Sequence, residues 1–304
     1  MESSADREAA LALERELRRE GDPTAGDLAR PTGAGYDLPR LRLTERRLVI
    51  VAVQIAIVVA IFTLWEVAAR HKWIDTFFWS SPSEIKDAGR HLIASGRLWR
   101  DTMFTLQSAL IGFVAGTVGG AVIGLSLWWS RFVARVVEPL IVAFHAIPKL
   151  ALTPLLVLFF GIGLSSKVAL VVMSTVVITA LTASAGVKAV DDDLITLLAS
   201  LGASRSQIFR KVVVPSTMPW IVSALRLNIG LSLTASVVGE IIGSNHGLGR
   251  MIYEGSALFE ISTVWVGVFT LATIAVIMFV VVGSLERYLL RGILHGGAAP
   301  PRRR

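Results

Sequence analysis

Residues 190–215 read VDDDLITLLASLGASRSQIFRKVVVP, a stretch that is too polar to cross a lipid bilayer but carries apolar residues at helical spacing. It lies between two long apolar segments, 166–187 and 217–242. Three carboxylates at 191–193 suit the start of a helix, because the helix dipole favours negative charge there. Gly202 interrupts the helix and allows a turn, and Pro215 is expected to end the unit. We therefore predict two short helices in a polar loop between two membrane spans.

The composition of the whole chain is that of a membrane protein. Of its 304 residues, 53% are apolar and 17% are charged, whereas roughly 25% are charged in soluble domains. The mean hydropathy is +0.64. The absence of cysteine excludes disulfides, thiolate metal sites and a cysteine nucleophile. The net charge of +7 is consistent with a nucleic-acid or a membrane partner, and the charge-poor body of the chain favours the lipid bilayer and no nucleic acid.

Six apolar stretches are long enough to cross a bilayer, since a hydrocarbon core of about 30 Å needs roughly 20 residues of helix. Lipid cannot satisfy backbone polar groups, so these stretches are predicted to be helices. The predicted fold is an all-α integral membrane protein with about six transmembrane helices. The predicted spans are 48–69, 104–128, 136–160, 166–187, 217–242 and 263–285.

Two polar tails flank the predicted membrane domain of residues 48–291. Residues 1–47 mix charge with proline and glycine and are predicted to be a flexible charged tail, and residues 292–304 form a short basic tail. With the N-terminus inside, 20 of the 30 Lys and Arg residues fall in inner segments and 8 in outer loops. We therefore expect both termini in the cytoplasm, although six of the outer residues lie in the loop 70–103 and oppose this bias.

A row of glycines marks one face of the second span, with Gly112, Gly116, Gly120 and Gly124 at every fourth position. Small residues at this spacing let helix backbones approach closely in lipid. The row indicates either packing within one subunit or a seam between two subunits, and the sequence leaves both open.

The third span contains three prolines, at 139, 148 and 154, and each removes an amide donor and clashes with the preceding turn. We expect this span to be kinked or broken. Broken membrane helices occur where protein or a water-filled cavity covers the freed carbonyls, so residues 144–153 are a candidate lining for a solute path. A kink that serves packing alone is the alternative.

Four polar side chains are candidates for that lining. His145 and Lys149 are four residues apart and share a face of the third span. An ionisable group at the bilayer centre costs roughly 2.5–3.5 kcal/mol, so one that occurs there usually faces a cavity or a partner. We predict that both line a path for an anionic solute together with Asn228 and Ser232 of the fifth span. The alternative is that Lys149 stabilises helix ends.

The sequence carries no motif for covalent chemistry or ATP hydrolysis. Its five histidines are scattered, and neither an H-E-x-x-H motif nor a glycine-rich loop ending in Gly-Lys-Ser or Gly-Lys-Thr is present. We expect no catalytic residues, no metal site and no cofactor in this chain.

The loop at 190–215 resembles the EAA loop of ATP-binding cassette importer permeases. The resemblance rests on Gly202, nine further residues, an aliphatic Val212, and then Val214 and Pro215. In that family the loop contains the coupling helix, which sits in a cleft of the ATPase subunit. The family's Glu-Ala-Ala is replaced here by Thr-Leu-Leu at 196–198, so the polar contact of that glutamate is not expected.

Three further stretches are similar to the branch of these permeases that handles nitrate, sulfonates, taurine and thiamine precursors. The resemblance implies a type I importer permease that acts as a homodimer in a prokaryotic inner membrane and works by alternating access. It also implies cytoplasmic ATPase partners that bind ATP and Mg, and an extracytoplasmic solute-binding protein. The stretches are SPSEIKDAGRHLIASGRLWRDTMFTL (81–106), AIPKLALTPLLVLFFGIGLSSKVAL (146–170) and GEIIGSNHGLGRMI (239–252).

The resemblance assigns ATPase docking to the coupling helix and its flanks. The implied docking residues are Leu198, Ala199, Leu201, Gly202, Ala203, Ser204, Gln207, Phe209 and Pro215.

Two simpler interpretations of the loop and one other function remain as alternatives. Gly202 can be an ordinary helix C-cap, and the basic residues Arg205, Arg210 and Lys211 can anchor the loop near anionic lipid headgroups, in addition to docking. A stand-alone secondary transporter or channel subunit is the alternative function. Inverted repeats are typical of such transporters, and the sequence shows no convincing repeat.

Overall fold

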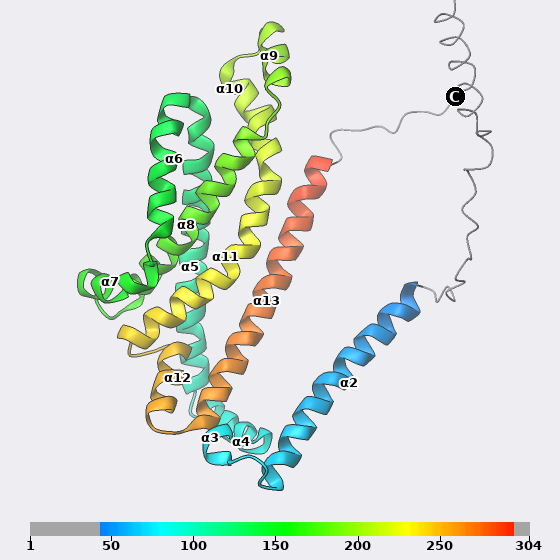
Figure 1. Cartoon of the computed structure of the whole chain (residues 1–304), viewed down its shortest axis with the longest axis vertical. Coiled ribbons are helices and arrows are strands. Elements are labelled where there is room, and N and C mark those ends of the chain that lie inside the picture. Colours follow the sequence, from blue (N-terminus) through cyan, green and yellow to red (C-terminus); the bar gives the residue numbers. More distant parts are fainter. Residues whose placement is uncertain (1–42, 295–304) are drawn as a thin grey trace, which may run out of the picture. The chain divides into compact units, whose positions relative to one another are not determined.

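The computed structural model describes residues 43–294, and side chains from residue 48 to residue 287. The chain divides into two compact units, 1–60 and 61–304, and the described part of the first is the start of helix α2 (Leu43–Arg70). Within the described residues the chain consists of helices and turns without a β-strand, so the all-α prediction is confirmed. The other helices are α3 (Thr76–Trp79), α4 (Pro82–Ala94), α5 (Arg97–Ser126), α6 (Arg131–Ala146), α7 (Thr153–Phe160), α8 (Leu164–Lys188), α9 (Asp192–Ser200), α10 (Arg205–Ile208), α11 (Val214–Gly243), α12 (Leu248–Ala257) and α13 (Ile261–Leu294) (Figure 1).

The long apolar helices agree with the predicted spans. Within residues 43–294, five helices are long and apolar enough to cross a membrane, and a bent pair raises the number to six. The pair is α6 and the helical stretch Lys149–Phe160, which meet at an angle of 76°. The third span is therefore broken, as its prolines predict. α11 is longer than expected, because it continues upstream into one helical run, Arg205–Gly243.

The glycine row of α5 faces α8 of the same subunit. A methyl group at Gly112, Gly116 or Gly124 would overlap side chains of α8, and one at Gly120 would overlap the α8 backbone. The two helices thus approach as closely as glycine permits, which supplies van der Waals contact where lipid offers no hydrophobic drive. Of the two interpretations of the row, packing within one subunit is the correct one.

A buried carboxylate fixes the turn between α11 and α12. Glu240 is fully buried, and it accepts hydrogen bonds from Thr105 Oγ1 at 3.0 Å and from the backbone N–H of Gly249 at 2.8 Å. Gly247 has a φ of +112°, and a Cβ there would collide with the Glu240 side chain, whereas a Cβ at Gly249 would collide with the Val237 carbonyl and lie close to Glu240. The two glycines therefore make the space in which the carboxylate lies.

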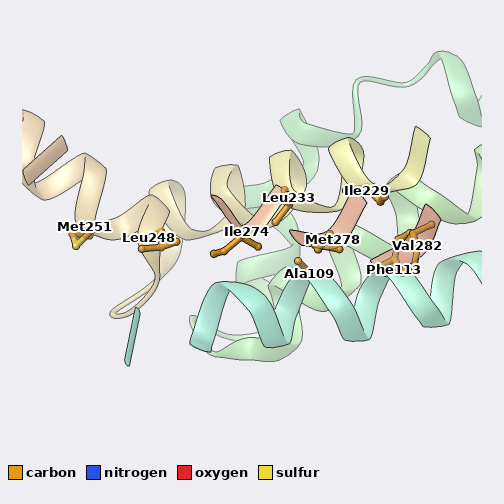
Figure 2. Packing of buried hydrophobic residues seen from close by; sticks show 9 residues of the cluster. All are labelled: Ala109, Phe113, Ile229, Leu233, Leu248, Met251, Ile274, Met278 and Val282. Carbon is orange, nitrogen blue, oxygen red and sulfur yellow. The ribbon is translucent and has the colours of Figure 1, made fainter. Parts of the chain in front are cut away.

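Nine buried apolar side chains pack α5, α11, α12 and α13 together (Figure 2). In a membrane this cluster contributes dispersion and shape complementarity, because the alternative environment of each side chain is equally apolar. The residues are Ala109, Phe113, Ile229, Leu233, Leu248, Met251, Ile274, Met278 and Val282. Other α13 side chains such as Val276 and Val280 are about three-fifths exposed (62% and 61%), as suits a surface that faces lipid.

An ion-pair cluster joins the start of α5 to α12. Glu254 accepts hydrogen bonds from Arg250 Nε at 2.7 Å and from the guanidinium of Arg97. Partial burial opposes ionisation of the Glu254 carboxyl, but the hydrogen bonds and charges of the two arginines outweigh it and hold the pKa of Glu254 below its usual value. Because the folded-state pKa is lowered, the cluster contributes its stability above the pKa of an ordinary glutamate and loses it as the pH falls.

The glycine row predicts a sharp difference between two neighbouring residues of α5. A Cβ at Gly120 would meet the Val176 carbonyl and the Thr179 side chain, whereas a Cβ at Gly119 meets only Val176 Cγ2, at an ordinary 3.8 Å. We expect Gly120→Ala to destabilise the protein by about 1–3 kcal/mol through overpacking. Gly119→Ala, which gains the same helix propensity of about 1 kcal/mol, is the matched control and should be neutral or stabilising. Thermal unfolding in detergent measures both, and equal midpoints would show that the close contact does not matter.

Candidate functional site

The polar loop at 190–215 forms the two short helices that its sequence predicts. Asp191 caps the start of α9, because its Oδ1 accepts a hydrogen bond of 2.8 Å from the backbone N–H of Asp193. The carboxylates of Asp192 and Asp193 lie in the first turn, where they complement the helix dipole. We call residues 191–208, which contain α9 and α10, the coupling segment.

Gly202 ends α9 in a left-handed conformation, with a φ of +83°. The N–H of Gly202 donates to the carbonyl of Ala199, and that of Ala203 donates to the carbonyl of Leu198, each at 3.0 Å. This pair of bonds is a Schellman motif, which satisfies the last carbonyls of the helix. No atom lies within 4 Å of a Cβ at Gly202, so backbone conformation and not space requires glycine there.

A capping box begins α10 directly after that turn. The N–H of Gln207 donates to Ser204 Oγ at 3.3 Å, and the N–H of Ser204 donates to Gln207 Oε1 at 2.8 Å. Both side chains belong to the predicted docking residues, and in the structure they hold the start of α10. The turn between the two helices is thus fixed at both ends by local hydrogen bonds.

Pro215 does not end the unit, and that expectation from the sequence is wrong. The chain stays helical through Pro215, because a π-helical turn over Phe209–Val213 precedes it. In this wide turn the N–H of Val214 donates to the carbonyl of Phe209, five residues back. The turn relieves the clash that a proline makes with the carbonyl four residues earlier in a regular helix. The coupling segment therefore continues into α11 without a break.

Aromatic contacts anchor the end of α10 to the helical turn Leu127–Trp129 that follows α5. The ring of Phe209 lies 5.4 Å from the rings of both Trp128 and Trp129. Arg205 places its guanidinium 5.3 Å from the Trp128 ring centroid and donates to the Trp129 carbonyl at 2.9 Å. Ile208 is buried. Phe209, predicted as a docking residue, therefore packs on the membrane body of the subunit.

The outer surface of α9 presents a row of leucines. Leu194, Leu197 and Leu201, which we call the leucine face, are 41%, 56% and 74% exposed. Leu194 and Leu197 are not among the predicted docking residues, although their spacing to Leu201 at i, i+3 and i+7 is the signal of a shared face. Of the predicted docking residues, Ala199, Gly202, Ser204 and Gln207 are exposed, and Leu198, Ala203 and Pro215 are partly buried.

The predicted path residues of the third span lie at its break. Lys149 Nζ donates to the carbonyl of His145 at 3.2 Å, which is one of the last carbonyls of α6. This is the helix-end contact that the sequence analysis gave as the alternative role of Lys149. His145 is exposed and Lys149 is partly buried, and their contact with a solute stays a prediction.

The predicted path residues of the fifth span are enclosed between helices. Asn228 and Ser232 are fully buried, and Asn228 Nδ2 donates to Thr117 Oγ1 of α5 at 3.1 Å and to Thr179 Oγ1 of α8 at 2.8 Å. Asn228 thus joins three helices. Because neither residue is accessible, the four candidates do not share an open surface within this subunit.

The helices, the broken third span and the coupling segment together define a transmembrane subunit of a solute importer. Residues 110–294 match the family described as "Binding-protein-dependent transport system inner membrane component", and the chain belongs to this family. It is a multi-pass permease subunit of an ATP-binding cassette importer, a family in which the ATPase is a separate subunit. The family resemblance of the sequence is confirmed.

Individual relatives and a solved structure agree with this assignment. The taurine transport system permease protein TauC of Escherichia coli is 29% identical over 244 residues, which are 79% of this chain and 89% of the relative. The formylaminopyrimidine transport permease protein ThiX of Halalkalibacterium halodurans is 31% identical over 231 residues, 76% of this chain and 91% of the relative. A chain of the inward-facing MetNI methionine ABC transporter shares the fold, with a TM-score of 0.56 at 22% identity, over 63% of this chain and 95% of that one.

Proposed function

We propose that cytoplasmic ATPase subunits bind the leucine face of α9 and drive this permease through that contact. The observation that carries the proposal is the exposure of three leucines on a segment too polar to lie within lipid. Burying a leucine side chain is worth about 1.5–3 kcal/mol, so the three together can supply several kcal/mol of docking energy. ATP and Mg would bind to the partner and not to this chain.

The proposed docking site is stiff enough to transmit force. The Schellman motif and the capping box fix the angle between α9 and α10, and α10 continues into α11 as one helical run, Arg205–Gly243. A displacement of the coupling segment would therefore move α11. Asn228 and Glu240 would pass that movement to α5, α8 and α12.

If two such subunits enclose one path, movement of their spans can open that path to one side of the membrane at a time, which is alternating access. We propose a homodimer in which the break between α6 and Lys149–Phe160 lines that path, because broken spans need protein or water around their freed carbonyls. An extracytoplasmic binding protein would deliver the cargo. Membership of the family speaks against a stand-alone secondary transporter or channel.

The docking proposal predicts that an acidic residue on the leucine face separates the permease from its ATPase. Leu201→Asp removes an apolar contact of about 1.5–3 kcal/mol, so we expect ATPase affinity to fall about tenfold or more in co-purification and binding assays. Leu258→Asp is the matched control, because Leu201 and Leu258 are both helix C-caps, 74% and 67% exposed. Equal ATPase binding by the two variants would refute docking at the leucine face.

The proposed topology predicts opposite labelling of two serines. With both termini in the cytoplasm, Ser200 in α9 lies inside and Ser256 in α12 lies outside, and both are exposed. The chain lacks cysteine, so Ser200→Cys and Ser256→Cys each carry a single thiol. An impermeant maleimide should label Ser256→Cys in intact spheroplasts and Ser200→Cys only in inverted vesicles. The reverse pattern would place the coupling segment on the wrong side for an ATPase.

We propose a small polar solute such as a sulfonate or a thiamine precursor as the cargo, because relatives named for taurine and formylaminopyrimidine transport match more than three-quarters of the chain. Nitrate belongs to the same set of candidates. Calorimetry of the partner binding protein with these compounds should show one of them to bind with an affinity at least about a hundredfold above the others. Binding of none of them would remove the whole set.

A further inference from the structure

A cavity of about 570 Å³ lies beside the coupling segment, outside the leucine face and the candidate solute path. Its wall comes from the helical turn Leu127–Trp129 after α5, the start of α6, the end of α8, and α9 and α10. It is therefore built where membrane helices and the coupling segment meet.

The cavity is lined by more positive than negative side chains. Arg131, Arg135, Lys188 and Arg205 stand against the carboxylates of Glu138 and Asp192. Glu138 is already engaged, because it accepts hydrogen bonds from Lys188 Nζ at 2.6 Å and from Ser184 Oγ.

Three of the four cations have no counter-charge among the described side chains, and one of these three, Arg205, instead contacts the Trp128 ring and donates to the Trp129 carbonyl. Among side chains between residues 48 and 287, no carboxylate lies within ion-pair distance of Arg131 or Arg135, and both are exposed. Arginine suits the recognition of phosphate, because its planar guanidinium can donate two parallel hydrogen bonds. The charge of the cavity therefore fits a phosphate group.

The position of the cavity fits the headgroup level of a bilayer. The spans of α5 and α8 end beside it, at Trp129 and Lys188, and the broken third span begins beside it at Arg131. Trp128 lines the cavity next to Trp129, and tryptophan is enriched at the boundary between lipid and water. Leu127, Val187 and Ile208 add an apolar wall, which suits the glycerol and acyl part of a lipid better than a soluble phosphate compound.

Because the cavity is positively charged, lies at the headgroup level and has a partly apolar wall, we propose that it binds an anionic phospholipid such as phosphatidylglycerol. Arg131 and Arg135 hold the phosphodiester, and Arg205 of α10 also lines the cavity. The bound headgroup contacts both α6 and the coupling segment, and so stabilises the packing of α10 against the membrane helices. The assignment to the cytoplasmic leaflet rests on the proposed function, whereas binding of the lipid does not.

The test measures lipid retention by the full chain, without the ATPase, in nanodiscs of phosphatidylcholine that contain a trace of spin-labelled phosphatidylglycerol. The double variant Arg131→Gln with Arg135→Gln removes both proposed contacts. The control, Lys86→Gln with Arg287→Gln, removes the same charge from exposed residues outside the cavity wall. We expect the wild type and the control to prefer phosphatidylglycerol about tenfold over labelled phosphatidylcholine, and the test variant to lose this preference.

Each other outcome overturns the proposal. Equal preference in all three proteins would mean that these arginines do not recognise the headgroup. Displacement of the lipid by millimolar inorganic phosphate would assign the cavity to a soluble phosphate compound. Unchanged lipid preference in the test variant, with impaired ATPase binding in a separate co-purification assay, would assign the arginines to the ATPase interface. Because the lipid measurement contains no ATPase, its result is independent of the Leu201→Asp experiment.

Discussion

The close contact of α5 with α8 along four glycines is the constraint on which the rest of the subunit depends. In lipid, apolar side chains gain nothing by leaving their solvent, so helices associate through backbone proximity and buried polar contacts. The glycine row brings the backbones together. Asn228 of α11 then reaches threonines on both helices. The position of α11, and with it the coupling segment, follows from this three-helix junction.

The continuity of α10 with α11 explains how a small segment can act on a large one. A displacement of a flexible loop would change only the conformation of the loop's own backbone, whereas a helix transmits a displacement along its axis. The π-helical turn before Pro215 keeps the helix intact at the residue that would otherwise interrupt it. Binding energy at the coupling segment can bias the spans only if the two transport states make different contacts, and a rigid connection is what links those contacts to the spans.

Much of the fold could be predicted from the sequence, because length and apolarity alone decide which segments can cross a bilayer. The broken third span and the turn at Gly202 followed from the local chemistry of proline and glycine. The burial of Asn228 and the orientation of Phe209 could not be predicted, since both depend on which helices become neighbours. The passage of α11 through Pro215 was also missed, because local rules treat proline as an end and a π turn leaves no clear signal in one sequence.

The enclosure of Glu240 has a consequence for how this region can evolve. Its carboxylate, the Thr105 hydroxyl and the two glycines at 247 and 249 occupy one shared volume. A larger residue at Gly247 displaces the carboxylate, one at Gly249 collides with the Val237 carbonyl beside it, and a shorter acid leaves buried donors unmet. Substitutions at these positions should therefore be strongly epistatic, so that lineages exchange the whole quartet together or keep it intact.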